Sequence, residues 1–494
     1  MTSSERVGPA AVRKAGTVGT WDVEADVVVV GYGCAGACAA IAAREAGAQV
    51  LLIERASGGG GTSANSGGLI YMGGGTPVQQ AAGFDDTPEE MFKFLMAALG
   101  PDPDEAKIRM FCDESVAHFH WLEAHGVPFK RTFYDEPGME APTDDCLVYS
   151  GGEDGHPFNR IAKPAPRAHK PRHPGAGGGF LMQKLVAATE RSGTRFEFDA
   201  RCERLVVDDR DRNRVVGVAI RQNGNERLIR ARRGVVLAAG GFASNREMVL
   251  RHTPLLARCA ALNATEGDDG SGIRMAMGAG ADIIRMHTLE VAYPLVPSRL
   301  LRGILVNRYG QRFINEDTYF GRLAQEALLR HDGEMLLIVD TAIYEPTIFG
   351  MQAAFVEETV ADLERAIGLP AESLQDTVAY YNRFAAQGAD PLFHKRPSFL
   401  QPLTEPPFAA LDCRTGSQNT NVGAVFSALT LGGLHTLPSG EVLDPDANII
   451  PGLYAAGRTT SGVAGGGYCT GISLGDGTFF GRKAGERAAT ANAG

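Results

Sequence analysis

The clearest pattern of apolar and polar positions lies near the N-terminal end of the chain. Residues 25–30 include four consecutive valines, and such a β-branched run is typical of a strand buried on both faces, as in a parallel sheet. Residues 34–46 then have a helical pattern that Gly47 ends, and residues 50–53 form a second apolar strand. This order predicts one strand–helix–strand unit of an α/β fold.

A change of pattern divides the rest of the chain into an interrupted domain and an insert. Residues 1–24 look like a loose leader, and residues 25–285 form the first part of one domain. From residue 286 to residue 428 longer helices and Pro-rich connections indicate an inserted second domain, and residues 429–494 complete the first. Within the first part we expect a helix, a β-hairpin and a buried strand, at residues 181–191, 204–230 and 235–239.

Composition and charge argue against several classes of function. Of the 494 residues, 44% are hydrophobic and 21% are charged, as in ordinary soluble globular proteins. The net charge of −10, without a block of basic residues, argues against nucleic acid as a partner. No apolar run reaches about 18 residues, so we expect no stable membrane insertion. The cysteines form no C-x-x-C pair, so we expect no metal site and a reduced, cytoplasmic protein.

A glycine-rich turn between the first strand and the helix points to a phosphate site. It reads Gly31-Tyr32-Gly33-Cys34-Ala35-Gly36, which fits G-x-G-x-x-G. The glycines allow a tight turn, close approach of a pyrophosphate and packing of helix on strand, and the helix N-terminus offers unpaired N–H groups. Glu54 ends the next strand, where a carboxylate accepts hydrogen bonds from ribose hydroxyls. The motif predicts a dinucleotide site and leaves NAD and FAD both open.

Further glycine-rich segments favour FAD. Residues 58–68 are small enough for backbone to pass close to a second phosphate or a flat ring. Together with residues 451–458 and 475–477 they resemble the fumarate reductase/succinate dehydrogenase flavoprotein family, and the likeness covers residues 24–490. It implies a Rossmann-like FAD-binding domain with an inserted α+β substrate-capping domain. Non-covalent FAD is expected, because no histidine stands in a recognisable flavin-linkage setting.

The same resemblance assigns positions along the cofactor. Ser473 and Leu474, at the start of the last helix, are expected at the flavin N1/O2 edge, where reduced flavin gathers negative charge. Asp269 is expected near the ribityl chain, and the Cys202 backbone near the adenine. The remaining expected cofactor residues are Gly31, Gly33, Cys34, Ala35, Gly36, Glu54, Arg55, Gly61, Thr62, Ser63, Ser66, Gly67, Gly68, Ala239, Gly240, Gly457 and Arg458.

The expected reaction end departs from the fumarate reductases. Those enzymes carry an arginine there for their dicarboxylate, whereas the matching residues 465–473 hold Tyr468 instead. A neutral phenol donates one hydrogen bond, which suits a ketone oxygen better than a carboxylate. This segment and residues 315–319 (Asn-Glu-Asp-Thr-Tyr) resemble the 3-ketosteroid dehydrogenases. The Tyr-Ala-Gly-Pro-Gly typical of Δ1 members is absent, which favours the Δ4-(5α) type.

That resemblance implies an enzyme that introduces a C4–C5 double bond into a saturated 3-ketosteroid, with an electron acceptor that reoxidises the flavin. The Tyr468 O–H and the Gly471 N–H are expected to polarise the C3 oxygen. Tyr319 is expected to take the C4 proton, while flavin N5 takes hydride from C5. A free tyrosine has a pKa of about 10, so we expect its pKa to be lowered by a second phenol or a solvent relay. Thr470 is expected to support Tyr468 or to touch the substrate.

Other interpretations of the same residues stay open. The chain could be a Δ1-dehydrogenase or a flavin-containing subunit without turnover. It could also reduce a small unsaturated acid such as fumarate, in which case Arg299 or Arg302 would serve the carboxylate. Tyr149 could line the substrate pocket, and Glu316 is interpreted as scaffold for the turn before the candidate base. The basic residues 163–172 are expected to form a solvated surface loop.

Overall fold

The strand–helix–strand unit predicted near the N-terminal end is confirmed. It consists of β2 (Val23–Val30), α2 (Cys34–Glu45) and β3 (Val50–Ile53). The two strands run parallel with Val30 opposite Ile53, and all residues of β3 are buried, as the continuous apolar run requires. The computed structural model describes residues 7–136, 140–208, 210–211, 213–347, 352–415 and 426–492.

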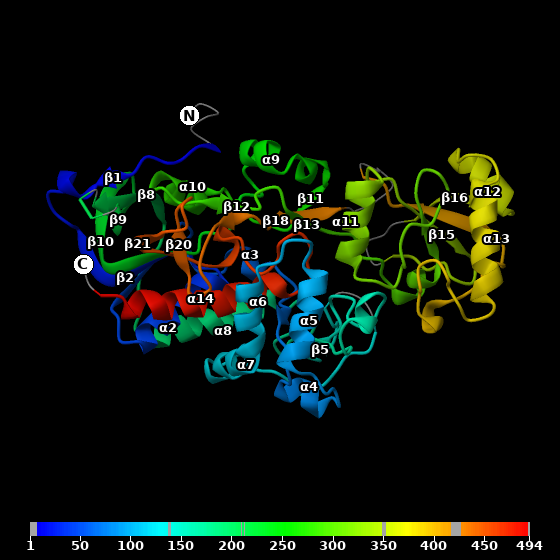
Figure 1. Ribbon diagram of the computed structural model, residues 1–494, viewed down its shortest axis with the longest axis horizontal. Coiled ribbons are helices and arrows are strands. Elements are labelled where there is room, and N and C mark those ends of the chain that lie inside the picture. The colour runs from blue at the N-terminus through cyan, green and yellow to red at the C-terminus, as the bar shows by residue number, and fades with distance from the viewer. Residues whose placement is uncertain are drawn as a thin grey trace.

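This unit belongs to a nine-stranded sheet, counted over the described residues (Figure 1). Its longest strand, β10 (Asn225–Leu237), pairs with β9 (Arg214–Gln222) along its first half and lies between β2 and β21 (Ile449–Ala455) along its second. The sequence predicted a hairpin and a separate strand here. One continuous strand forms instead, and a bulge between Ala231 and Gly234 shifts its register against β2. The other strands of this sheet are β1 (Arg13–Lys14), β7 (Arg195–Glu197), β8 (Ala200–Asp208) and β20 (Glu441–Leu443).

A closely packed helix pair lies against this sheet below the nucleotide turn. The helix α14 (Ile472–Thr490) runs along α2 (Figure 1). A Cβ at Gly477 would lie 2.9 Å from Cys34 Sγ, and one at Gly481 would strike the Ala35 carbonyl, so glycine permits this approach. The pairing fixes the start of α14 near the start of α2. The other helices of this domain are α3 (Gly61–Ala64), α4 (Pro77–Ala81), α5 (Pro88–Ala98), α6 (Glu105–Asp113), α7 (Ser115–Ala124), α8 (Gly178–Arg191), α9 (Arg246–His252) and α10 (Ser271–Gly278).

The insert is built on a second sheet, which Figure 1 shows apart from the first. The strand order is β14 (Ile304–Val306), β15 (Leu336–Asp340), β17 (Phe408–Asp412) and β16 (Ala353–Glu357). Its helices are α11 (Phe320–Arg330), α12 (Val360–Ile367) and α13 (Ser373–Ala385).

The chain passes between the two domains through a pair of short strands. β13 (Leu289–Ala292) runs antiparallel to β18 (Ser427–Thr430), and Figure 1 shows both between the two larger sheets. The domain limits at residues 286 and 428 remain sequence predictions. The remaining short strands are β4 (Ile70–Tyr71), β5 (Leu147–Val148), β6 (Ala168–His169), β11 (Ala261–Leu262), β12 (Ile283–Ile284) and β19 (Gly433–Leu434).

The described part of the N-terminal segment is attached to the first domain, in contrast to the expected loose leader. Strand β1 pairs with β8, and the Ala10 N–H donates to the Arg274 carbonyl at 2.8 Å. Backbone pairing of this kind ties a terminal segment down. Among the described residues, no helix combines the length and the apolar character that a bilayer crossing needs.

Candidate functional site

A cavity of about 1040 Å³ opens at the carboxyl ends of the parallel strands. Glu54 follows β3, Gly31 follows β2, Ala239 follows β10 and Gly457 follows β21, and all four residues line the cavity. Open α/β sheets bind their ligands at this edge, because loops there diverge around a crevice and helix N-termini point into it. The sheet therefore places the predicted nucleotide residues around one space.

The glycine turn forms the cradle that its motif predicts. Gly31 has a φ of +102°, which L side chains rarely adopt. A Cβ at Gly36 would strike the Gly31 carbonyl, so this glycine serves packing and does not line the cavity. Cys34 begins α2 and its N–H donates to Ser63 Oγ at 3.2 Å. A helix start with small residues around it fits a pyrophosphate.

The ribose end carries an acid and an ion-pair cluster. Glu54 accepts the Tyr32 N–H at 2.7 Å and the Ala56 N–H at 2.9 Å, which fixes its carboxylate at the rim. Asp269, expected near the ribityl chain, instead pairs with Arg55 at 3.0 Å and with Arg201 at 2.9 Å. Both arginines line the cavity. Asp269 does not line it and is connected to it only through its ion pairs with these arginines.

The neighbouring residue Asp268 takes the lining position. It accepts the Gly241 N–H at 2.7 Å and forms an ion pair with Arg458. The other expected cofactor residues line the same cavity, namely Gly33, Ala35, Gly61, Thr62, Ser63, Ser66, Gly67, Gly68, Cys202, Gly240, Ser473 and Leu474. The residues present therefore fit FAD along the whole predicted length of the cofactor.

The expected ketone donors lie at the other end of the cavity. Tyr468, Thr470 and Gly471 line it, just before α14. The Tyr468 hydroxyl donates to Ser473 Oγ at 2.8 Å and accepts the Ser473 N–H at 3.2 Å. Burial raises the pKa of Tyr468, so its phenol stays a neutral donor.

Tyr319 joins this end from the inserted domain. It stands at the N-terminal cap of α11, and a Cβ at Gly321 would meet its ring, so the glycine lets the phenol lie over the first helical turn. The Thr470 hydroxyl donates to the Tyr319 hydroxyl at 3.1 Å, so Thr470 supports Tyr319 and not Tyr468. Tyr319 in turn donates to Glu290 Oε1 at 2.8 Å.

Glu290 is a site residue that sequence reasoning missed. It lies in β13 opposite Leu429 of β18, and both residues line the cavity. It is 5% exposed, and burial raises its pKa from 4.5 to about 8. The available signal was a single carboxylate inside an apolar strand, Leu-Glu-Val-Ala, because a buried charge is costly and marks functional sites.

The expected lowering of the Tyr319 pKa does not occur. Burial and the neighbouring Glu290 and Tyr468 raise it well above the ordinary value of 10.0. A buried phenol beside a carboxylate resists a second negative charge, so a free phenolate is strongly disfavoured. Tyr319 can therefore act as a base only if its own proton leaves at the same time.

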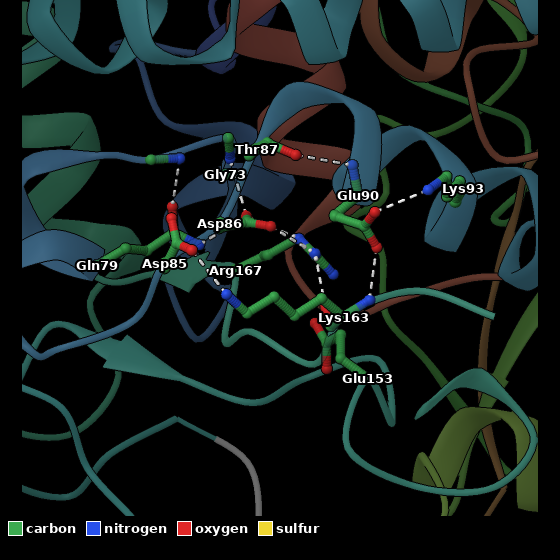
Figure 2. A network of polar contacts seen from close by, with 12 residues as sticks. Gly73, Gln79, Asp85, Asp86, Thr87, Glu90, Lys93, Glu153, Lys163 and Arg167 are labelled. Carbon is green, nitrogen blue, oxygen red and sulfur yellow. Dashed lines mark hydrogen bonds and ion pairs between the residues drawn. The ribbon is translucent and has the colours of Figure 1, made fainter. Parts of the chain in front are cut away.

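The basic residues 163–172 are not a solvated loop, because several of them are buried. Arg167 is 0% exposed and pairs with Asp86 at 2.7 Å (Figure 2). Glu153 lies in the same network, and Figure 2 shows it near Arg167. It accepts the N–H groups of Ser150 and Gly151 at 3.2 and 2.9 Å.

This network is connected to the reaction end through hydrogen bonds between Ser150 and Thr470. The Ser150 hydroxyl donates to the Thr470 carbonyl at 2.8 Å, and the Thr470 N–H donates to the Ser150 carbonyl at 3.2 Å. Glu153, through Ser150, thus holds the loop that places Thr470 beside Tyr319. Buried charges of this kind are costly unless they have polar partners, and Arg167 finds one in Asp86.

The remaining candidate residues lie around a second cavity of about 580 Å³. Tyr149, Arg299 and Arg302 line it and do not line the first cavity. Tyr319 also lines only the second cavity, and its hydroxyl contacts Thr470 and Glu290 in the wall of the first. Glu316 pairs with Arg312 at 2.8 Å in the insert, which agrees with a scaffold role.

Comparison with known proteins agrees with this site. Residues 26–474 match a family described as FAD binding domain. The crystal structure of 3-ketosteroid-Δ4-(5α)-dehydrogenase from Rhodococcus jostii RHA1, in complex with 4-androstene-3,17-dione, is 49% identical. That match covers 97% of this chain and 100% of the other, with a TM-score of 0.92.

Two further relatives are more distant. The 3-oxo-5-alpha-steroid 4-dehydrogenase of Comamonas testosteroni is 29% identical over 88% of this chain and 93% of its own. The fumarate reductase (cytochrome) of Shewanella frigidimarina is also 29% identical, over 94% of this chain and 77% of its own.

Proposed function

We propose a reaction for this chain from the premise that it belongs to the FAD binding domain family. It is an FAD-dependent oxidoreductase that introduces the C4–C5 double bond into saturated 3-ketosteroids. The observation that carries the proposal is the grouping of Tyr468, Thr470 and Gly471 at one end of the FAD cavity. Tyr319 lines the second cavity and contacts this group through its hydrogen bond with Thr470. The 49% identity to a Δ4-(5α)-dehydrogenase supports the same reaction.

The donors at this end suit a ketone. A C–H beside a carbonyl becomes acidic when the oxygen is held by hydrogen-bond donors, because negative charge gathers there as the proton leaves. In the proposed reaction the Tyr468 O–H turns from Ser473 to the C3 oxygen, and the Gly471 N–H provides a second donor. The left-handed backbone of Gly471, with φ +98°, aims this segment at the start of α14.

The proton acceptor and the walls complete the proposed site. Tyr319 takes the C4 proton through its hydroxyl oxygen, in the position where Thr470 holds it. Ala292, Leu429 and Phe320 line the cavity with apolar surface, which suits steroid rings and excludes water. FAD, when bound, supplies the acceptor for the hydride that leaves C5.

The structure offers less for reduction of an unsaturated acid. Arg299 and Arg302 are exposed and border the second cavity, so neither cation lines the FAD cavity. Arg458 lines it but is paired with Asp268. A dicarboxylate needs charge-assisted partners, and this end presents phenols and hydroxyls.

The test is anaerobic mixing of the FAD-loaded protein with 5α-androstane-3,17-dione. We expect loss of the visible absorbance of the oxidised flavin and formation of the 4-ene-3-ketone, identified by its mass and ultraviolet spectrum. Formation of the 1-ene would assign Δ1 chemistry instead. Fumarate should not reoxidise the reduced protein. A flavin that no saturated 3-ketosteroid reduces would contradict the proposal.

A further inference from the structure

Glu290 is a buried carboxyl that has no role in the reaction as proposed above. In β13, Leu289 and Val291 pack into the apolar core, while Glu290 and Ala292 alternate onto the cavity wall. All residues of β13 and β18 are described, and Glu290 is the one charged residue of the two strands. A carboxyl in such a place is retained for its chemistry, because an apolar residue would pack there at lower cost.

We propose that Glu290 accepts the phenolic proton of Tyr319 while Tyr319 takes the C4 proton of the substrate. The hydrogen bonds give this transfer its direction. The Thr470 hydroxyl donates to the Tyr319 oxygen at 3.1 Å, so the phenolic hydrogen points to Glu290 Oε1 at 2.8 Å. Glu290 acts through Tyr319 and is a positioning and proton-accepting residue. The inference rests on the proposed dehydrogenation.

The proposed step balances without a further reactant. The C4–H bond breaks, its electron pair forms the C3–C4 double bond of an enolate, and the proton forms a new O–H bond on Tyr319. The original Tyr319 O–H breaks and its proton forms an O–H bond on Glu290, so the phenol is neutral before and after. The enolate then regains its C3 carbonyl and forms the C4–C5 double bond as hydride leaves C5 for the cofactor.

The surroundings of the pair favour transfer over ionisation of the phenol. Tyr319 is 5% exposed, and a phenolate there would lie beside the Glu290 carboxylate. Burial also makes Glu290 a stronger base than an exposed glutamate, so it accepts a proton more readily. The titratable groups that face it are Tyr319 from α11 and Tyr468 and Cys469 before α14, while β18 presents Leu429.

Glu290→Gln separates proton transfer from packing, because the amide oxygen still accepts a hydrogen bond but takes no proton. We expect anaerobic flavin reduction by 5α-androstane-3,17-dione to slow by about 10²–10⁴-fold. In the unmodified protein the rate should rise with pH through about 8, and Glu290→Gln should lose this rise. Deuterium at C4 should slow the variant by a larger factor than the unmodified protein. Glu290→Asp should recover part of the rate.

Glu326→Gln is the matched control. Glu326 lies on α11 and pairs with Arg330 at the surface, so its loss should leave the rate and the pH profile unchanged. Infrared difference spectra provide a second measurement, recorded about one unit above pH 8, where Glu290 starts as a carboxylate. In time-resolved spectra a transient protonated-carboxyl band should appear as the steroid reduces the flavin, in the unmodified protein and Glu326→Gln but not in Glu290→Gln, and it should decay as Glu290 releases the proton to solvent.

The outcomes distinguish this inference from the proposed function. A Glu290→Gln variant with the unmodified rate and pH profile overturns the inference while the steroid reaction stands. A missing transient carboxyl band in the unmodified protein overturns it even if the variant does not fold. If the steroid never reduces the flavin, the proposed function fails first. The pair is then tested by ultraviolet titration of the FAD-loaded protein, where Glu290→Gln should lower the pKa of one buried tyrosine and an unchanged titration contradicts the coupling.

Discussion

The two ends of the main cavity are built in different ways. The phosphate end consists of one short turn and the start of one helix, and its glycines act through backbone geometry. The reaction end combines β13, the start of α11 and the segment before α14, which are far apart in the sequence. Substitutions at the first end should therefore affect binding and folding, and those at the second should affect rates.

The largest expected effect is at Tyr319. Tyr319→Phe removes the hydroxyl that accepts the C4 proton and should slow flavin reduction by about 10³-fold or more, while steroid still binds. Stopped-flow reduction and steroid-induced shifts of the flavin spectrum measure the two quantities. The exposed Tyr309→Phe serves as control. Near-normal reduction by Tyr319→Phe would remove this residue from the chemistry.

Tyr468 should have the next largest effect. Tyr468→Phe removes one donor to the developing oxyanion and should slow flavin reduction by about 10²–10³-fold. The packing of the ring stays, so affinity for the steroid should change little. Tyr380→Phe, on the surface of the insert, is the matched control. A change in affinity alone, with normal reduction, would assign Tyr468 to packing.

A substitution at the phosphate end should act on stability. Gly36→Ala places a Cβ against the Gly31 carbonyl, and overpacking of this kind costs about 1–3 kcal/mol. We expect a lower unfolding temperature and weaker retention of FAD, measured by thermal melts and by absorbance after dialysis. Gly16→Ala, which has open space around it, is the control. An unchanged unfolding temperature with a slower steroid reaction would contradict the assignment of stability effects to the phosphate end.

The smallest effect is a change in pH dependence at the reaction end. The folded protein raises the pKa of Glu290 from 4.5 to about 8, so between these values it holds a proton that the unfolded chain has released. The free energy of unfolding should therefore fall as pH rises from about 4.5 through about 8. Glu290→Gln should remove this part of the fall, as urea unfolding at a series of pH values would show. Equal slopes in both proteins would place the pKa of Glu290 near its ordinary value.

The contrast also explains what the sequence could predict. The strand–helix–strand unit and its glycines are local features, so the fold class was predicted, and nearly all expected cofactor residues line one cavity. Asp268 and Asp269 are adjacent, and the choice between them depends on partners such as Arg458 and Arg55, which sequence spacing does not place. Glu290 was missed for the same reason, because its role depends on contact with Tyr319 across two elements.

The basic segment at residues 163–172 differs from the predicted solvated loop because charge alone does not show which cations are buried. Arg167 and Lys170 are both 0% exposed. Arg167 finds Asp86, and Lys170 donates to backbone carbonyls such as that of Thr143 at 2.8 Å. Burial of a cation depends on partners that fold around it, and the sequence of the loop itself does not reveal them.

The strand crossing between the domains has a mechanical consequence. Tyr319 belongs to the insert, Thr470 to the segment before α14, and Glu290 to the crossing strand β13. A hinge motion of the insert about β13 and β18 would change the Thr470–Tyr319 and Tyr319–Glu290 separations together. Opening the domains would therefore break both hydrogen bonds. An open conformation that admits steroid would not transfer the C4 proton until the domains close.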